Sequence, residues 1–556
     1  MRFFKKYYLP IGLVAIVLLN VLFAFYSYRI DLTADKRYTI SKPTQELMRK
    51  VKTPVTITIY LEGDLNAGFL RLKRSTAELL DDFNNYCTKT INYKFVDPSL
   101  AENTDERNAN YEKLVADGMT PTMIYENTPD GNTSQKVVFP WAKITYNGKT
   151  RNVLLLKNVQ GNSGEQNLNI SIETLEYEFT DALRTMMQTS VSKIAFIEGH
   201  GELDERATYD VCTALSKYFQ IDRGVLGNDP RILDAYKAIV IAAPQSPFSE
   251  SDKYIIDQYI MRGGRVLWLI DGVRLDPEAL SASGISPAIP LDLNITDQLF
   301  RYGVRINPVL LQDEQCMLIP VNVSQDGTSP DFQPMPWYFA PLLNTSPYHA
   351  VTRNVTQLAG NFVSTIDFVG ENTRQRKEVL LATSNATHLI TTPSTVNVGS
   401  VEISPDHFNT AYQPVGVAIE GVFESIFAHR MQPENIISDK QTNKQSVPTK
   451  QIVVATGTVI SNEIENGQAL PAGYDRYTQK QFGNRDFAVN ALLYLSDDEG
   501  WINLRNKEFT LRLLNKNIAR TNRTFYQWIN VGLPIILLVI FGFAFMFIRK
   551  KIYTKN

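Results

Sequence analysis

The sequence predicts an α/β fold with a doubly wound, mainly parallel sheet, and three observations in residues 193 to 271 support this prediction. Short apolar runs rich in β-branched residues, typical of strands buried on both faces of a parallel sheet, occur at Ile194 to Ile197, Ala238 to Ala243 and Val266 to Ile270. Two amphipathic runs, DERATYDVCTALSKYFQ and SESDKYIIDQYI, lie between them and predict crossover helices. Gly263 and Gly264 stand between the second helix and the third strand, where a C-cap favours glycine.

A loop directly after the first strand is the candidate site. It reads Glu198, Gly199, His200, Gly201, Glu202. Ligands of open α/β sheets bind at the carboxyl ends of strands, so a site is expected here. The alternative is a tight glycine turn with solvated charges. We expect Glu198, His200 and Glu202 to cap the central sheet and to contact a ligand or a neighbouring domain without catalysing a reaction.

A smaller α/β domain is predicted ahead of this region. Ser41 and Pro43 open a helix, and VTITIYLEG, LKRSTAELLDDFNNYCT and INYKFVDPS follow as strand, helix and strand. Hairpins are expected around Asp130-Gly131 and around Asn147-Gly148, because both dipeptides favour two-residue turns between alternating strands. Residues 171 to 189 form a helix that leads into the central stretch.

Residues beyond 271 continue the larger domain. DLNITDQLFRYGVRINPVLLQD predicts helix, glycine turn and strand, IVVATGTVISN a buried strand, and NRDFAVNALLYL a helix. Residues 325 to 348 are crowded with prolines and aromatics and predict an ordered surface loop. The sheet is therefore expected to be built on residues 191 to 320 and 376 to 500.

Two uncharged runs, residues 8 to 28 and 528 to 548, are long enough for helices that cross about 30 Å of hydrocarbon. Basic residues precede the first run and follow the second, so both termini are expected in the cytoplasm. A cleaved signal peptide is the competing interpretation of the first run, but no small-x-small site follows it. Gly532, Pro534 and Gly542 in the second run suit packing against other membrane helices. Alternatively, this helix only tethers the C-terminus.

Composition excludes several classes of function. With 56 basic and 58 acidic residues, the chain has no electrostatic case for nucleic-acid binding. Cys87, Cys212 and Cys316 are too widely spread for a zinc site, and no metal or cofactor is predicted. The string Gly148-Lys149-Thr150 resembles the end of a phosphate-binding loop, but such a loop requires Gly at position 143, which is Lys here. The string also lies in a predicted hairpin, whereas a phosphate-binding loop lies between a strand and a helix.

Several motifs in this order resemble one family of bacterial proteins. RIDLTADKRYTIS after the first span, IAFIEGHGE, the Gly-Gly turn, LFRYGVRINPVLLQD, GNRDFAVNALLYL and a closing span with a basic tail are similar to the GldG-type auxiliary subunits of bacterial ABC transporters. The resemblance covers nearly the whole chain. It implies a non-catalytic, amidotransferase-like fold outside the cytoplasm that acts beside a permease subunit and a separate ATPase subunit, and that serves gliding motility together with further motility components.

The sequence departs from the catalytic pattern of amidotransferase-like enzymes. Such an enzyme needs a Cys on a sharp strand-to-helix turn and a His that takes its proton. The corresponding turn here is AAPQSPFSES and contains no Cys. Ser246 and Ser249 do not lie in a Gly-x-Ser-x-Gly elbow. Cys212 lies in a helical pattern, and the remaining histidines, His349, His388, His407 and His429, have no paired nucleophile. We therefore expect no enzymatic activity.

The predicted organisation places a large periplasmic region between two anchors in the bacterial inner membrane. Its parts are a cytoplasmic tail (1–7), a transmembrane helix (8–28), an N-terminal α/β domain with hairpins (29–170), an amidotransferase-like α/β domain (171–500), a helical stalk (501–527), a second transmembrane helix (528–548) and a cytoplasmic basic tail (549–556). The first hypothesis for its function is an ABC transporter accessory subunit. A sugar- or peptide-binding module at Glu198 to Glu202 is the second, and a degenerate hydrolase is the third.

Overall fold

The computed structural model describes residues 39–127, 133–159, 162–188, 191–322, 324, 331–370, 374–398, 406–437, 442–506 and 520–553, together with Val14, Val17 and Leu18. The chain divides into two units. One unit joins Met1–Tyr38 with Glu508–Asn556, and the other is Thr39–Lys507.

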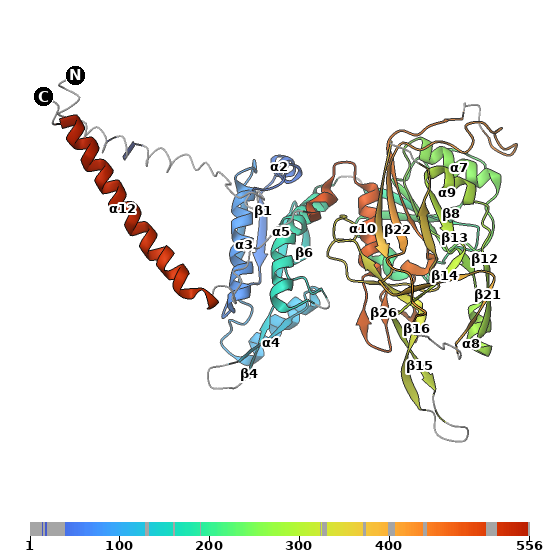
Figure 1. Cartoon of the computed structure of the whole chain (residues 1–556), viewed down its shortest axis with the longest axis horizontal. Coiled ribbons are helices and arrows are strands. Elements are labelled where there is room, and N and C mark those ends of the chain that lie inside the picture. The colour runs from blue at the N-terminus through green and yellow to red at the C-terminus, as the bar shows by residue number, and fades with distance from the viewer. Residues whose placement is uncertain are drawn as a thin grey trace. The chain divides into compact units, whose positions relative to one another are not determined.

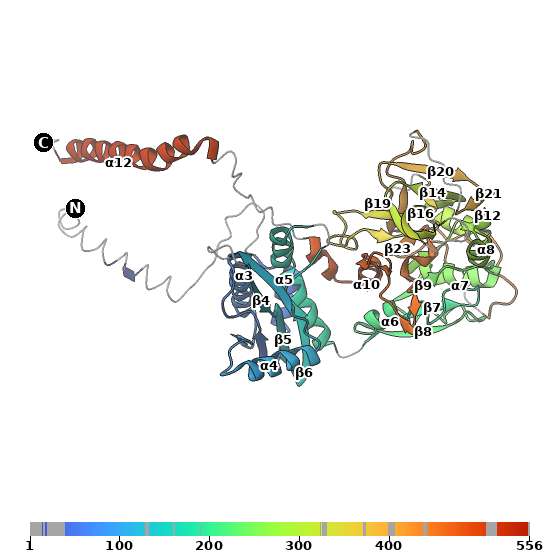
Figure 2. The same ribbon diagram turned by 90° about the horizontal axis from the view of Figure 1, so that it is seen from below.

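The N-terminal part of the larger unit is a four-stranded sheet in the order β2-β1-β5-β6. β1 pairs with β2 in parallel and with β5 antiparallel. Helices α3 and α5 lie side by side over this sheet (Figures 1 and 2) and bury residues such as Leu72, Phe83 and Phe179 in a common core. The elements are α2 (Lys42–Arg49), β1 (Val55–Ile59), α3 (Ala67–Asn84), β2 (Ile91–Phe95), α4 (Thr104–Ala116), β3 (Thr122–Asn127), β4 (Thr133–Val138), β5 (Trp141–Tyr146), β6 (Lys149–Leu154) and α5 (Gly164–Met187).

Local sequence signals explain several of these elements. The Ser41 side chain caps α2 by accepting a hydrogen bond from the backbone N–H of Thr44, as predicted. Asn147 and Gly148 have φ angles of 48° and 77°, which a two-residue hairpin turn with two left-handed residues requires. β3 and β4 pair as the hairpin predicted around Asp130-Gly131. The Asp130-Gly131 turn lies outside the described residues.

A larger sheet follows, with its strands in the order β15-β16-β19-β22-β23-β10-β9-β7-β8. The strands from β8 to β23 are parallel, and those from β23 to β15 are antiparallel. The expected mainly parallel arrangement therefore holds for one half of the sheet only. The parallel strands are β7 (Ser192–Glu198), β8 (Phe219–Val225), β9 (Ala238–Ala242), β10 (Val266–Leu269) and β23 (Thr449–Val454).

Helices cover both faces of the parallel half (Figure 2), which is why its strands are apolar throughout. Alternate residues of each strand point to opposite faces. Val240 of β9 packs with α6 (Tyr209–Leu215) and α10 (Asn484–Ser496), whereas Ile241 packs with α7 (Glu250–Met261) and α9 (Thr296–Tyr302). The fold class is thus mixed α/β. Its finer classification as doubly wound and amidotransferase-like stays a prediction.

Two local expectations were wrong. The run DERATYDVCTALSKYFQ is not helical throughout, because α6 ends at Leu215 and Phe219 already begins the edge strand β8. The proline-rich run 325 to 348 is not a loop in its described part, since Phe332–Thr345 form strand β16. Among the described residues, positions 332 to 337 of β16 have ladder partners on β15 only, and a strand segment that is paired on one side tolerates prolines whose missing donor faces the other side. β15 and β16 project as a two-stranded arm (Figure 1).

Shorter elements complete the unit. They are β11 (Val273–Arg274), α8 (Pro277–Ser283), β12 (Ile285–Pro290), β13 (Val304–Asn307), β14 (Val309–Asp313), β15 (Cys316–Asn322), β17 (Leu358–Ala359), β18 (Thr365–Phe368), β19 (Gln375–Ala382), β20 (Thr387–Thr391), β21 (Ser394–Asn397), β22 (Pro414–Gly421), η1 (Gly457–Ile460), β24 (Ile464–Glu465), β25 (Gln468–Ala469), β26 (Tyr474–Asp475), β27 (Lys480–Gln481) and η2 (Trp501–Asn506). The predicted helix, glycine turn and strand after residue 291 are α9, Gly303 (φ 103°) and β13.

In its described residues, the smaller unit contains one long apolar helix, α12 (Arg523–Tyr553). Its segment Arg523–Lys551 is long and apolar enough to cross a membrane. The first predicted span, residues 8 to 28, lies outside the described residues except for three helical positions. The described start of the predicted stalk is the 3₁₀ helix η2, whose Trp501 and Leu504 are buried in the core of the N-terminal sheet.

Candidate functional site

The carboxyl ends of the parallel strands form one continuous edge of polar loops. β7 is followed by the predicted site loop, β9 by Ala243, β10 by Asp271, and β23 by Gly457. These segments touch one another. The backbone carbonyl of His200 accepts hydrogen bonds from the N–H groups of Gln245 (2.7 Å) and Ser246 (2.9 Å), and the N–H of Gly457 donates to Asp271 (2.6 Å).

The two glycines of the site loop allow a sharp reversal after β7. Gly199 and Gly201 have φ angles of 117° and 77°, which side-chain-bearing residues rarely adopt. A Cβ atom on Gly201 would lie 3.1 Å from the Cβ atom of Gln245. The loop therefore turns tightly and lies against the segment that connects β9 to α7.

His200 is buried, with 7% of its surface exposed, and both ring nitrogens have carboxylate partners. Nδ1 lies 2.9 Å from Oε1 of Glu202, and Nε2 lies 3.3 Å from Oδ2 of Asp252 in the first turn of α7. The ring stacks on Phe248 with 3.7 Å between the centroids. The second oxygen of Glu202 accepts the backbone N–H of His200 at 2.7 Å. His200 thus links its own loop to α7.

These contacts fix the charge of the ring. Burial alone would lower the pKa of His200, but hydrogen bonds to Asp252 and Glu202 outweigh it and raise the pKa to about 9. The pKa of Asp252 is lowered, since hydrogen bonds from His200 and Ser249 outweigh burial. At neutral pH the imidazole is a cation between two carboxylates, so it has no free nitrogen with which to accept a proton.

The charged ends of the loop are also engaged. Only 1% of the Glu202 side chain is exposed. Glu198 is 40% exposed and pairs with Arg223 at 2.7 Å. Arg223 donates further hydrogen bonds to Thr208 and to the carbonyl of Leu203, which join the loop to the segment before α6. The predicted residues therefore come together at the sheet edge, mostly in contact with one another and with neighbouring elements.

Ala243, directly after β9, has a left-handed backbone with φ 52°. This conformation costs a residue with a side chain about 1 kcal/mol or more. Strained strand-to-helix turns present the nucleophile in many hydrolases. Here the residue at the strained position carries only a methyl group. Ser249, later in the same turn, caps α7 by accepting the N–H of Asp252.

The three cysteines are unsuited to nucleophilic catalysis. Burial raises the pKa of Cys87 to about 11 and that of Cys316 to about 12, and it also raises the pKa of Cys212. A thiol with a raised pKa supplies little thiolate at neutral pH. The rings of His388 and His407 lie against each other with centroids 4.0 Å apart and a tilt of 31°. His429 is exposed, and burial lowers the pKa of His349. No cluster suited to a metal ion occurs in the part of the chain that the structure describes.

Sequence reasoning missed Asp271. This half-buried residue follows β10, and its carboxylate accepts the Gly457 N–H. Burial raises the pKa of Asp271 to about 6, while the Gly457 hydrogen bond opposes the shift. A carboxylate at the end of a fully apolar strand, VLWLID, was the available signal. The pattern of this strand predicts a fold element and by itself assigns no role to the residue that follows it.

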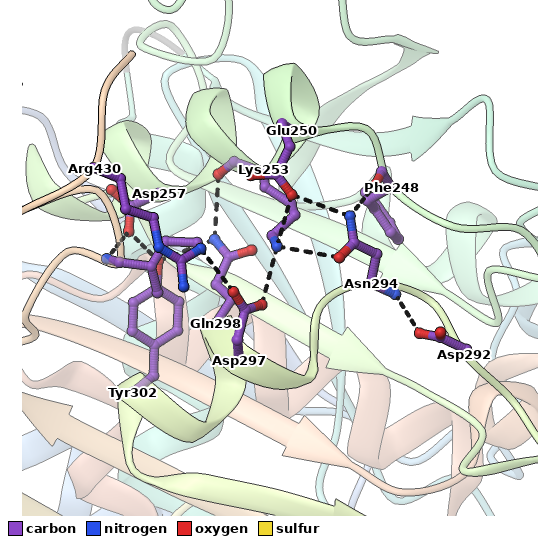
Figure 3. A network of polar contacts seen from close by, with 11 residues as sticks. Phe248, Glu250, Lys253, Asp257, Asp292, Asn294, Asp297, Gln298, Tyr302 and Arg430 are labelled. Carbon is purple, nitrogen blue, oxygen red and sulfur yellow. Dashed lines mark hydrogen bonds and ion pairs between the residues drawn. The ribbon is translucent and has the colours of Figure 1, made fainter. Parts of the chain in front are cut away.

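A polar network beside this edge joins α7 to α9 (Figure 3). The Lys253 ammonium, 1% exposed, lies 3.1 Å from Glu250 and 3.0 Å from Asp297, and it also donates to Asn294. Asp297 in turn pairs with Arg430 at 2.9 Å. The network holds the loop before α9 against α7, because Lys253 on α7 contacts Asn294 in that loop and Asp297 in the first turn of α9. The buried ammonium group thereby has partners for its charge.

The membrane-helix candidates lie on α12. Pro534 is inside the helix. A Cβ atom on Gly542 would meet nothing within 4 Å, and one on Gly532 would meet only the Trp528 ring at 3.8 Å. The surface around both glycines is therefore open for close approach by another helix.

Comparisons with known proteins place most of the larger sheet in one family. Residues 192–491 match the model of the family described as "ABC-type uncharacterized transport system", and residues 34–145 match a domain of unknown function, DUF7088. No curated protein matches the sequence. A solved structure described as "mmIFT52 N-terminal domain" is 14% identical and aligns over 55% of this chain and 99% of its own, with a TM-score of 0.33. A TM-score this low supports no inference about fold or function.

The family match covers more than half of the chain. It begins at β7 and ends within α10, so it includes the parallel strands, the site loop and Asp271. The chain belongs to the family of auxiliary proteins of ABC-type transport systems.

Proposed function

We propose that the protein is a membrane-anchored accessory subunit of an ABC transporter that works with a separate permease and a separate ATPase. The family match over residues 192–491 is the observation that carries this proposal. The apolar helix α12 supports the anchor. The GldG-type motifs extend the proposal to gliding motility, to two spans with both termini in the cytoplasm, and to a periplasmic region with a doubly wound, amidotransferase-like fold.

The proposed role is non-catalytic. Two observations support it. The residue at the strained turn, Ala243, has a methyl group and no nucleophilic atom. Burial raises the pKa of all three thiols, so they supply little thiolate at neutral pH. We propose that the loop from Glu198 to Glu202 caps the sheet edge and orders the neighbouring elements. Its His200 and Glu202 side chains are almost fully buried in mutual contacts, which favours this role over capture of a sugar or peptide.

Association with the permease through α12 is tested by replacing residues 528 to 548 with an unrelated apolar helix of equal length. Because length and hydropathy are kept, the variant should stay in the membrane. Co-purification with the permease in mild detergent should fall, because the specific packing surface is lost. If co-purification is undiminished and transport or motility stays intact, the helix serves only as a tether. Failure to recover any ABC permease with the wild-type protein would contradict the proposed function itself.

A further inference from the structure

Asp271 is one of the residues that line a cavity of about 440 Å³ at the carboxyl edge of the parallel strands. The cavity lies between the end of β10, the segment from Pro290 to Ile295, the start of α9, and β13. Its size is within the range of small-molecule sites, and carboxyl edges of parallel strands are where ligands of α/β sheets bind. The predicted loop at Glu198 to Glu202 does not line it.

The cavity combines an apolar wall with carboxylates that lack cation partners. Ile270, Leu293 and Leu299 are almost fully buried and supply the wall. Among the residues that the structure describes, no lysine or arginine lies within ion-pair distance of Asp271 or of Asp292 at the rim. The nearby Lys253 is held by Glu250, Asp297 and Asn294 (Figure 3) and is not available to Asp271.

The other charged group in the lining is Arg305. Its Nη2 atom lies 3.2 Å from Asp367, and its Nε atom donates to Asn307 at 2.8 Å. Its charge is therefore offset by Asp367, and the two carboxylates leave the cavity with a net negative charge. A half-buried carboxylate such as Asp271 carries a desolvation cost when it has no cation partner, and a bound cation would offset part of that cost. At pH 7.5 Asp271 is mostly ionised, because burial raises its pKa only to about 6.

From this geometry we infer that the cavity beside Asp271 binds a small organic amine, with the ammonium group on the Asp271 carboxylate and the apolar body against Ile270, Leu293 and Leu299. The site is ordered before binding. The backbone N–H of Asn294 donates to Asp292 at 3.0 Å, and Asn294 also donates to the carbonyl of Phe248 at 2.9 Å, so the wall is fixed to the segment before α7. Such ordering reduces the entropic cost of binding.

Benzylamine is a suitable probe because it joins one ammonium group to a compact apolar body. Binding to the full-length protein in non-ionic detergent is measured by calorimetric titration at pH 7.5, with benzyl alcohol and benzoate as neutral and anionic analogues. Benzylamine should bind at least about tenfold more tightly than either analogue, since a charge-assisted hydrogen bond to a carboxylate is the difference between them.

Three variants in the same detergent test the site. Asp271→Asn keeps an acceptor for the Gly457 N–H and should weaken benzylamine binding about tenfold or more. Leu291→Trp keeps both carboxylates and should abolish binding by filling the cavity. The matched control Asp229→Asn, on an exposed loop outside the cavity, should bind as the wild type does. Lowering the pH to 5 should weaken binding to the wild type, because Asp271 becomes protonated.

Thermal melts establish that each variant is folded, and Leu291→Trp remains informative should Asp271→Asn unfold. The inference is overturned by no detectable benzylamine binding to the wild type, by equal binding to the Asp271→Asn protein, or by benzyl alcohol that binds as tightly as benzylamine. None of these results depends on whether the protein associates with a permease, so this test and that of the proposed function fail separately.

Discussion

His200 should stabilise the folded protein in a pH-dependent way. Its pKa is raised from about 6.5 to about 9 in the folded state, so the folded protein binds this proton more tightly than the unfolded chain does. The stabilisation is fully present below pH 6.5 and is lost as the pH rises through 9. We expect His200→Gln to lower the free energy of unfolding by about 3 kcal/mol at pH 6.5, and by progressively less up to pH 9.5.

Urea titrations of wild type and variant at several pH values measure this difference. Groups that do not contact His200 cancel in the comparison, so the change with pH reports the His200 ring together with its partners Glu202 and Asp252. A difference that stays constant from pH 6.5 to pH 9.5 would mean that the ring is not a cation between Glu202 and Asp252.

Gly457 is the residue on which the close approach of two strand ends depends. A Cβ atom at this position would lie 2.5 Å from the Cβ atom of Ala243 and 2.7 Å from Oδ2 of Asp271. Gly457→Ala should therefore destabilise the protein by about 1 to 3 kcal/mol, as overpacking of a tight site does. The urea midpoint measures the loss. Gly227→Ala is the control, because a Cβ atom there meets nothing within 4 Å; equal effects of both changes would refute the crowding.

At the scale of elements, the apolar pattern predicted the central strands and their order along the chain. Ser41 could be recognised as a cap because capping depends on local sequence, whereas the cap at Ser249 was not predicted. β8 was not predicted, because no glycine or proline between the amphipathic helix and FQIDRGV signals the end of the helix. β16 was not predicted because its prolines argue against a strand; they are tolerable because the segment around Pro334 and Pro336 is paired, among the described residues, with β15 on one side only.

The candidate site could be predicted in position but not in its contacts. The loop after β7 follows from the pattern of buried strands. The partner of His200, Asp252, is 52 residues away in sequence, and only the packing of α7 against the sheet edge brings the two together. The burial of Lys253 and the cavity beside Asp271 arise in the same way, from elements that are distant in the chain.

The small residues of α12 should matter for association and not for insertion. Ten residues separate Gly532 from Gly542, which places them about 80° apart around the helix. Gly532→Leu combined with Gly542→Leu keeps the helix apolar but blocks close approach of a neighbour. We expect normal recovery in the membrane fraction and reduced co-purification with the permease. Ala544→Leu, about 120° from Gly532 and about 160° from Gly542, is the matched control. If the glycine changes and the control reduce co-purification with the permease equally, the glycines have no special role.

At the scale of the whole molecule, the proposed topology places the larger unit on one side of the membrane and both termini on the other. The basic residues near the end of α12, Lys550 and Lys551, favour retention of this end in the cytoplasm. Single cysteines at Lys480 and at Lys551, both exposed, report the two sides once Cys87, Cys212 and Cys316 have been replaced. In cells whose outer membrane has been made permeable, an impermeant maleimide should label Lys480→Cys at once. Lys551→Cys should react only after detergent opens the inner membrane. Labelling of both positions without detergent would place the C-terminus outside and contradict the orientation that the basic tail predicts, whereas labelling of neither would place the larger unit in the cytoplasm.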